Sequence, residues 1–185
     1  RTAAAAMLLV GVLAVRAWAE LGDVLFEQKI SRESGGFTGD LESGDAFGFG
    51  VDGLGDLDGD GTPDVAVGAP GDNGEKGSNE GSFYILFLAP DGSVRSSEKF
   101  LPGTGPVAVP DSELGIDIAN LGDVDGDGVV DLAVGAPLFR EKDQPKSGTV
   151  WIAFLNADGT VKSTVRVDDE GSGFDGDLDK EDWFG

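Results

Sequence analysis

The feature that most constrains the fold of this chain is an internal repeat. The stretch GDLDGDGTPDVAVGAP, residues 55–70, recurs as GDVDGDGVVDLAVGAP, residues 122–137, at an offset of 67 residues. The same offset places residues 47–94 on residues 114–161 without a gap. An ungapped match of this length indicates two copies of one structural unit, and units of this kind bury their apolar faces against their neighbours.

Both units are predicted to consist of four short β-strands, because alternating or wholly apolar runs are separated by glycine-rich turns. The third run, GSFYILFL at residues 81–88, is apolar over six consecutive residues, so we expect both of its faces to be buried. Asp91–Gly92 and Asp158–Gly159 predict tight turns between the third and fourth strands. Four antiparallel strands per unit, repeated radially, predict an all-β fold of β-propeller blades. The predicted strands span residues 46–54, 63–69, 81–88 and 94–100 in the first unit and residues 116–121, 130–136, 149–155 and 161–167 in the second.

Charge and residue usage exclude several classes of function. The formal net charge of −22 on 185 residues argues against binding to nucleic acid and to anionic membrane surfaces. The chain contains no His and no Cys. The usual zinc sites and Ser-His-Asp or Cys-His catalytic sites therefore cannot be built from its residues. Hydrolysis by a pair of carboxylates stays open.

The first residues have the composition of a secretory signal peptide. A 13-residue apolar run, Ala3–Val15, follows Arg1, and Ala17–Ala19 places small residues before Glu20. We therefore predict a signal-peptide helix over residues 1–19, with cleavage at its end. A buried helix or an anchor is the alternative, although the run is too short to span a bilayer well.

A third copy of the unit begins near the end of the sequence. The stretch GGFTGDLESGDAFG at residues 35–48 resembles GSGFDGDLDKEDWFG at residues 171–185. The chain is therefore expected to be part of a longer protein with more units. The predicted organisation is a signal peptide at 1–19, an N-terminal strand and connection at 20–36, a first repeat at 37–103, a second repeat at 104–170 and the start of a truncated third repeat at 171–185.

Each unit carries a loop of the form D-x-D-x-D-G-x-x-D. Carboxylates at positions 1, 3 and 5 can converge on one point if the loop curls, and the glycine at position 6 permits the backbone angle that the curl requires. The carbonyl at position 7 and the carboxylate at position 9 complete a cage of oxygen ligands. Such a cage favours a hard cation, and its irregular geometry favours Ca²⁺ over Mg²⁺, so we predict one Ca²⁺ in each loop. The predicted ligands are Asp56, Asp58, Asp60, the Thr62 carbonyl and Asp64 in the first loop and Asp123, Asp125, Asp127, the Val129 carbonyl and Asp131 in the second.

The loops resemble the first half of an EF-hand, but an EF-hand also needs a bidentate Glu at position 12 and flanking helices. Position 12 is Val67 in the first copy and Val134 in the second, and a β-strand pattern comes next. The remaining alternative is an acidic, solvated turn, which the match of two copies at every ligand position disfavours. A third acidic run, Asp175–Asp179, lacks the glycine and the closing carboxylate, so we interpret it as a solvated connection between blades.

The combination of these motifs is similar to the FG-GAP repeat, which builds the propeller of integrin α subunits. Phe47–Gly48, the aspartate loop and Gly68–Pro70 carry the resemblance in the first unit. In the second unit Gly135–Pro137 matches, whereas Leu114–Gly115 departs from Phe-Gly. The resemblance implies calcium at both loops, on one rim of the propeller, and an extracellular setting. It also implies a closed ring, so that further blades of the parent chain or of an assembly are expected as partners.

The leading hypothesis for function is a secreted or cell-surface, non-enzymatic module. Structural Ca²⁺ would stabilise a propeller used for adhesion and for recognition of an extracellular protein or glycan. The alternative is a non-catalytic propeller part of a secreted enzyme such as a phospholipase or an esterase. The loops at 71–80 and 138–147 differ most between the units, so they are candidates for partner contact, with plain solvated turns as the alternative. Trp151 and Trp183 have the chemistry to stack on sugars, although single aromatic residues in strands are more often part of the core.

Overall fold

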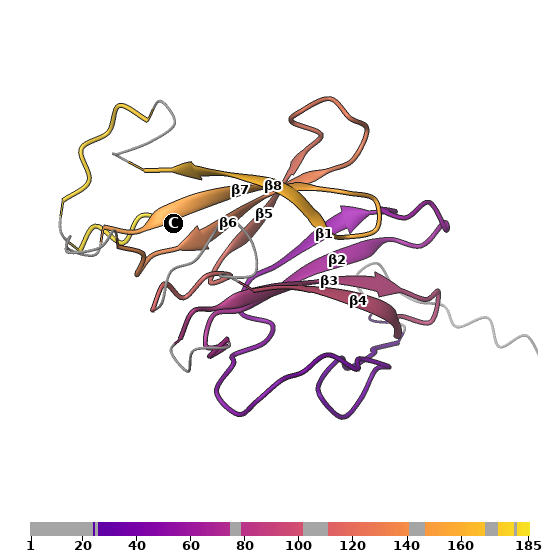
Figure 1. The fold of residues 1–185 in the computed structure, drawn as a ribbon. Coiled ribbons are helices and arrows are strands. Elements are labelled where there is room, and N and C mark those ends of the chain that lie inside the picture. The colour runs from indigo at the N-terminus through magenta and orange to yellow at the C-terminus, as the bar shows by residue number, and fades with distance from the viewer. Residues whose placement is uncertain are drawn as a thin grey trace, which may run out of the picture.

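The computed structural model of the protein describes residue 24 and residues 26–74, 79–101, 111–140, 147–168, 174–179 and 181–185. Within these ranges the regular secondary structure consists of eight strands and no helix, and the signal peptide predicted for residues 1–19 lies outside them. The strands form two four-stranded antiparallel sheets, in the orders β1-β2-β3-β4 and β5-β6-β7-β8 (Figure 1). Their bounds are β1 (Val51–Gly55), β2 (Asp64–Ala69), β3 (Ser82–Leu88), β4 (Val94–Phe100), β5 (Ile118–Gly122), β6 (Asp131–Ala136), β7 (Thr149–Leu155) and β8 (Val161–Val167).

The eight predicted strands are confirmed, and the main difference lies at the first strand of each unit. β1 begins at Val51 rather than at Ala46, because Ala46 and Gly48 have left-handed backbone angles, φ 56° and 92°, that interrupt an extended chain. β5 likewise begins two residues later than predicted, at Ile118. The expected alternation of apolar side chains does not bury them here, since Phe49 and Val51 are 64% and 56% exposed.

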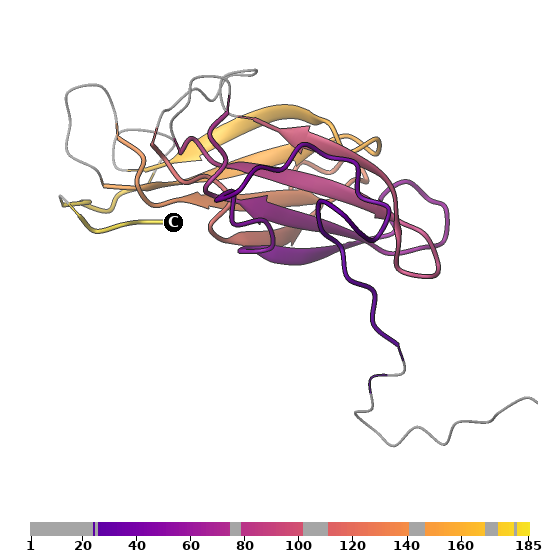
Figure 2. The same cartoon turned by 90° about the horizontal axis from the view of Figure 1, so that it is seen from below.

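The central strand β3 of the first sheet is buried on both faces, as its apolar sequence predicts. Successive side chains of a strand point to opposite faces. Phe83 and Phe87 therefore join a core cluster that includes Leu132 of the second sheet, whereas Tyr84 joins a second cluster. The segment before β1 closes this second cluster, and the ring centroids of its Phe37 and of Tyr84 are 5.3 Å apart. Figure 2 shows the segment, in indigo and purple, crossing over the first sheet.

A contact between two backbones joins the units. The dipeptide Leu114–Gly115, which opens the second unit, lies on the first sheet, where a Cβ atom added to Gly68 would overlap the carbonyl oxygen of Gly115. The same close approach recurs one unit later between Gly135 and Gly185. The glycine of the Gly-Ala-Pro motif is therefore required because a backbone occupies the space in which a side chain would stand.

This contact predicts a large difference between two glycine substitutions in the first sheet. Gly68→Ala should lower the free energy of unfolding by about 1–3 kcal/mol or more, because the neighbouring backbone must move. Gly53→Ala, in β1, meets no atom within 4 Å and should leave stability unchanged or raise it by about 0.5 kcal/mol. Urea unfolding of the two variants and the parent checks the difference, and equal stability of both variants contradicts the proposed contact.

Candidate metal centres

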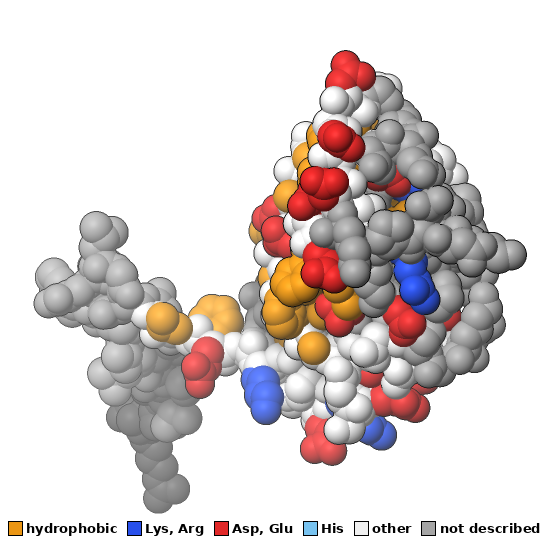
Figure 3. Space-filling model, turned by 90° about the vertical axis from the view of Figure 1, so that its left-hand side faces the viewer, with side chains coloured by type: hydrophobic (Ala, Val, Ile, Leu, Met, Phe, Trp, Pro, Cys, Tyr) orange, Lys and Arg blue, Asp and Glu red, His pale blue; other side chains and the backbone are white. Residues whose placement is uncertain are grey.

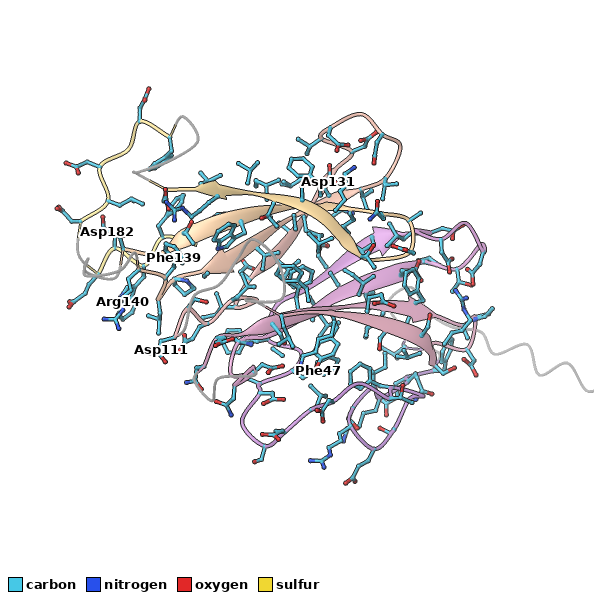
Figure 4. The ribbon with its side chains drawn as sticks, in the orientation of Figure 1. Phe47, Asp111, Asp131, Phe139, Arg140 and Asp182 are labelled. Carbon is cyan, nitrogen blue, oxygen red and sulfur yellow. The ribbon has the colours of Figure 1, made fainter. Side chains whose placement is uncertain are left out.

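Each aspartate loop connects the first and second strands of its sheet. The first loop joins β1 to β2 and the second joins β5 to β6; Figure 4 shows Asp131 at the base of the second loop, where β6 begins. Gly61 and Gly128, at position 6, have φ angles of 93° and 92°. The curl that the glycines were expected to permit is therefore present in both copies, with nearly equal backbone angles at this glycine.

The carboxylates of each loop come together in part. Oxygen atoms of Asp56, Asp58 and Asp60 all lie within 4.8 Å of one another in the first loop, and oxygen atoms of three aspartates do so in the second. The second group contains positions 1, 3 and 9 rather than 1, 3 and 5. Asp64 stands outside the first group and Asp127 outside the second. The members of the second group are Asp123, Asp125 and Asp131.

The aspartate at position 9 anchors each loop to the core. Asp64 is fully buried, and its two oxygens accept hydrogen bonds from the backbone N–H groups of Leu57, in the loop, and Leu88, at the end of β3, at 2.9 and 3.0 Å. Asp131 makes the matching contacts in the second unit. Burial raises the pKa of Asp64, and the nearby charge of Asp58 adds to this effect, against the two hydrogen bonds that lower it.

Within the loop, each aspartate also accepts hydrogen bonds from the loop backbone. Asp58 Oδ1 accepts from the N–H of Asp60, and Asp60 Oδ1 accepts from the N–H of Thr62, at 3.2 and 2.8 Å. In the second loop, Asp125 Oδ1 and Asp127 Oδ1 accept from the residues two further along the chain, the latter from Val129 at 2.9 Å. Such local bonds shape the loop. They use the Oδ1 atoms of the aspartates at positions 3 and 5 and leave the Oδ2 atoms of these residues available to other groups.

Two basic side chains that were not predicted from the sequence lie against these loops. Arg95, in β4, binds Asp58 Oδ2 at 2.5 Å and Asp60 Oδ2 at 2.8 Å. Lys162, in β8, binds Asp125 Oδ2 at 2.7 Å and also binds Asp127 Oδ2. The hydrogen bond from Arg95 lowers the pKa of Asp58. Arg95 and Lys162 are 67 residues apart, so the offset of the repeat was the signal that could have found them.

The other sequence candidates lie away from the loops. Asp175, Asp177 and Asp179 are exposed, in agreement with their interpretation as a solvated connection. Trp151 packs against the core between the sheets, with its ring 6.0 Å from that of Phe139. Trp183 is 62% exposed, so the expectation of a core residue is wrong at this position.

The loops expected to contact a partner are held to the fourth strand by different chemistry in each unit. Asp72 and Phe139 occupy matching positions, and the N–H of each bonds the carbonyl three residues earlier. Asp72 forms a 2.6 Å ion pair with Lys99, whereas the guanidinium of Arg166 lies 5.2 Å from the ring centroid of Phe139.

A hollow of about 200 Å³ lies beside the first of these loops. Its lining includes Asp45, Asp72, Asn73 and Lys99. The described parts of the two loops are residues 71–74 and 79–80 and residues 138–140 and 147.

The donor set of the aspartate loops suits a hard divalent cation. All of the groups that converge are carboxylate oxygens, which is the ligand chemistry of Ca²⁺ and Mg²⁺ rather than of zinc or copper. In both loops a positively charged side chain already bonds the aspartates at positions 3 and 5. Acidic side chains are also spread over the face of the molecule drawn in Figure 3, among few basic ones. The three carboxylates that converge in each loop therefore have the chemistry to hold a cation.

The fold and its loops can be compared with known proteins. The family model of the FG-GAP repeat matches residues 47–86 and 115–152, so two parts of the chain belong to the FG-GAP repeat family, and the two sheets have the strand order of its propeller blades. The chain is similar to integrin α-3 of Cricetulus griseus, with 36% identity over 75% of this chain and 13% of the relative. It is also similar to integrin α-4 of Xenopus laevis, with 34% identity over 64% of this chain and 11% of the relative.

The similarity covers only a small part of the relatives. The chain spans 13% of the length of the hamster integrin α-3 and 10% of integrin α-3 of Mus musculus, to which it is 36% identical over 114 residues. In the part of the chain that the structure describes, no helix has the length and apolar character needed to cross a membrane.

The anchoring role of position 9 is testable without any metal. In calcium-free buffer, Asp64→Ala should lower the free energy of unfolding by about 2–4 kcal/mol, because the buried N–H group of Leu57 and the partly buried N–H group of Leu88 lose their acceptor. Asp56→Ala, in the same loop, removes an exposed carboxylate and should change stability by less than about 1 kcal/mol. Chemical unfolding measures both effects, and a similar loss for the two variants contradicts the anchor.

Proposed function

We propose that this chain is a calcium-binding FG-GAP module of an extracellular propeller, used for adhesion or for recognition of a protein or glycan, and that it is not an enzyme. The observation that carries the proposal is the recurrence of converging carboxylates in matching loops of two matching sheets. The similarity to integrin α subunits supports the adhesive role. The chain has no His or Cys, which leaves it without the side chains of the usual nucleophilic hydrolases.

The proposed role of Ca²⁺ is structural. Bound to a loop, the ion would supply the positive charge that offsets the mutual repulsion of four carboxylates. Positions 1, 3 and 5 are exposed, whereas position 9 is buried in the core. The loop would then be held between two strands whose register is already set by the sheet. The proposed ligands are Asp56, Asp58, Asp60, the Thr62 carbonyl and Asp64, and Asp123, Asp125, Asp127, the Val129 carbonyl and Asp131.

A difference in exposure between the units supports further blades as neighbours. Leu54 and Leu57 of the first unit are only 3% and 9% exposed, because they join the core cluster between the two sheets. Their counterparts in the second unit, Leu121 and Val124, are 42% and 55% exposed. A third blade packed on the second sheet would cover this face as the second sheet covers the first.

We place the proposed partner contact on the loops between the second and third strands. They lie at the opposite end of the second strand from the aspartate loops, so calcium binding and partner contact would use separate rims of the propeller. The hollow beside the first loop is lined by Asp40, Glu42, Asp45 and Asp72 together with Lys99. Its acidic lining would suit a basic group of an extracellular partner.

Calcium removal tests the proposal directly. Addition of Ca²⁺ should raise the melting temperature, and a chelator should reverse the change, because an ion that binds only the folded state stabilises it. A hundredfold excess of Ca²⁺ over the dissociation constant corresponds to about 2.7 kcal/mol per site. Differential scanning calorimetry in calcium and in chelator measures the shift, and an unchanged melting temperature contradicts a structural calcium site.

A matched pair of double variants shows whether the shift comes from the aspartate loops. Asp58→Asn with Asp125→Asn removes one carboxylate from each loop and should abolish most of the calcium-dependent shift. Asp175→Asn with Asp177→Asn removes the same charge from exposed residues outside the loops and should leave the shift intact. Equal losses in both double variants would mean that calcium acts through net charge alone.

A further inference from the structure

We propose that Arg95 and Lys162 are built-in counter-ions of the two aspartate loops, and that calcium binds each loop by displacing them. This inference rests on the proposed calcium-binding function and adds what regulates it. In the metal-free loop, a side chain from the fourth strand neutralises part of the aspartate charge, and the affinity of the loop for calcium is set by competition with that side chain.

The hydrogen bonds of the loop aspartates define which atoms compete. In the first loop, the Oδ1 atoms of Asp58 and Asp60 accept bonds from the loop backbone, and their Oδ2 atoms are the ones that Arg95 binds. In the second loop, the division between Oδ1 and Oδ2 is the same for Asp125 and Asp127, with Lys162 on the Oδ2 atoms. A calcium ion that binds these Oδ2 atoms must therefore replace the basic side chain.

The arrangement occurs twice and from the same place in the fold. Arg95 is the second residue of β4 and Lys162 is the second residue of β8. In each sheet the fourth strand is the edge strand farthest from the first. The loop between the first and second strands and the turn between the third and fourth lie at one end of an antiparallel sheet. The long basic side chain therefore extends from the fourth strand to the aspartate loop and connects the two by ion pairs.

Exposure of the ion pairs makes the exchange possible. The side chains of Arg95 and Lys162 are 44% and 25% exposed, and the loop aspartates they bind are also partly exposed. Solvent-exposed ion pairs contribute little stability individually, so a divalent ion with several carboxylate ligands can displace them. In the absence of calcium, the same pairs reduce the repulsion among four like charges in one short loop.

Two consequences separate a counter-ion from an ordinary structural residue. Removal of the charge should weaken the metal-free protein, because the loop carboxylates lose their neutralising group. The same change should strengthen calcium binding, because the competitor is gone. A residue that only supported the fold would weaken both the metal-free protein and its calcium complex.

The experiment uses the full chain and the variants Arg95→Met and Lys162→Met, in which an unbranched apolar side chain replaces the charged one. Isothermal titration with CaCl₂ should show the altered loop binding roughly three- to tenfold more tightly, the size expected from loss of two exposed ion pairs. The melting temperature in chelator should fall, so that the gap between the calcium-bound and metal-free melting temperatures widens.

Arg140→Met and Lys162→Arg are the matched controls. Arg140 lies in the β6–β7 loop, at the other end of the second sheet from the aspartate loop, as Figure 4 shows for Arg140 and Asp131. Its substitution removes one positive charge without touching a loop aspartate, and it should not change the affinity. Lys162→Arg keeps the charge at the same place and should retain the affinity of the parent.

The outcomes separate this inference from the proposed function. If the parent protein shows neither heat of calcium binding nor a thermal shift, the proposed calcium site itself is wrong. If the parent binds calcium but Lys162→Met and Arg95→Met bind it equally or more weakly, the counter-ion exchange is wrong and the calcium site stands. An equal gain of affinity in Arg140→Met or in Lys162→Arg also overturns the exchange.

Discussion

The two sheets depend on one close contact, the approach of the Gly115 backbone to Gly68. Side chains normally separate packed sheets by about 10 Å, whereas here two backbones touch, and Gly81 also lies against Leu114, so that these contacts determine the relative position of the units. Apolar side chains such as Phe83 and Leu132 fill the wider space beside it. Because Gly135 and Gly185 repeat the contact, each sheet positions the opening segment of the next unit by the same means.

The aspartate loops depend in turn on the packed core of each sheet. Asp64 begins a buried strand and holds both its own loop and the end of β3 through two backbone hydrogen bonds. The base of the loop is thus bonded to the core, while its tip carries exposed carboxylates. Such a division suits a cation site, since a fixed base lowers the entropy lost on binding and an exposed tip lets the ligands adapt to the ion.

Much of this arrangement could be predicted because the repeat supplied two copies of the sequence pattern of each strand and loop. The eight strands and the curl of the loops were predictable from apolar runs and glycine positions. The start of β1 was not, because the strand begins only after two left-handed residues, and of these Gly48 is of a type that favours such an angle whereas Ala46 is not. Arg95 and Lys162 were missed because their contacts join the edge strand to a loop near the far edge, which no local spacing shows.

The matched positions of Asp72 and Phe139 have a consequence for how such an array can diversify. The same backbone turn carries an ion pair with Lys99 in one blade and a cation–π contact with Arg166 in the next. The side chain that fastens each loop is therefore interchangeable, and the sheet beneath does not change with it. Duplicated blades can then acquire unlike loop surfaces one at a time, and two blades with the same backbone can differ in how their loops respond to salt and pH.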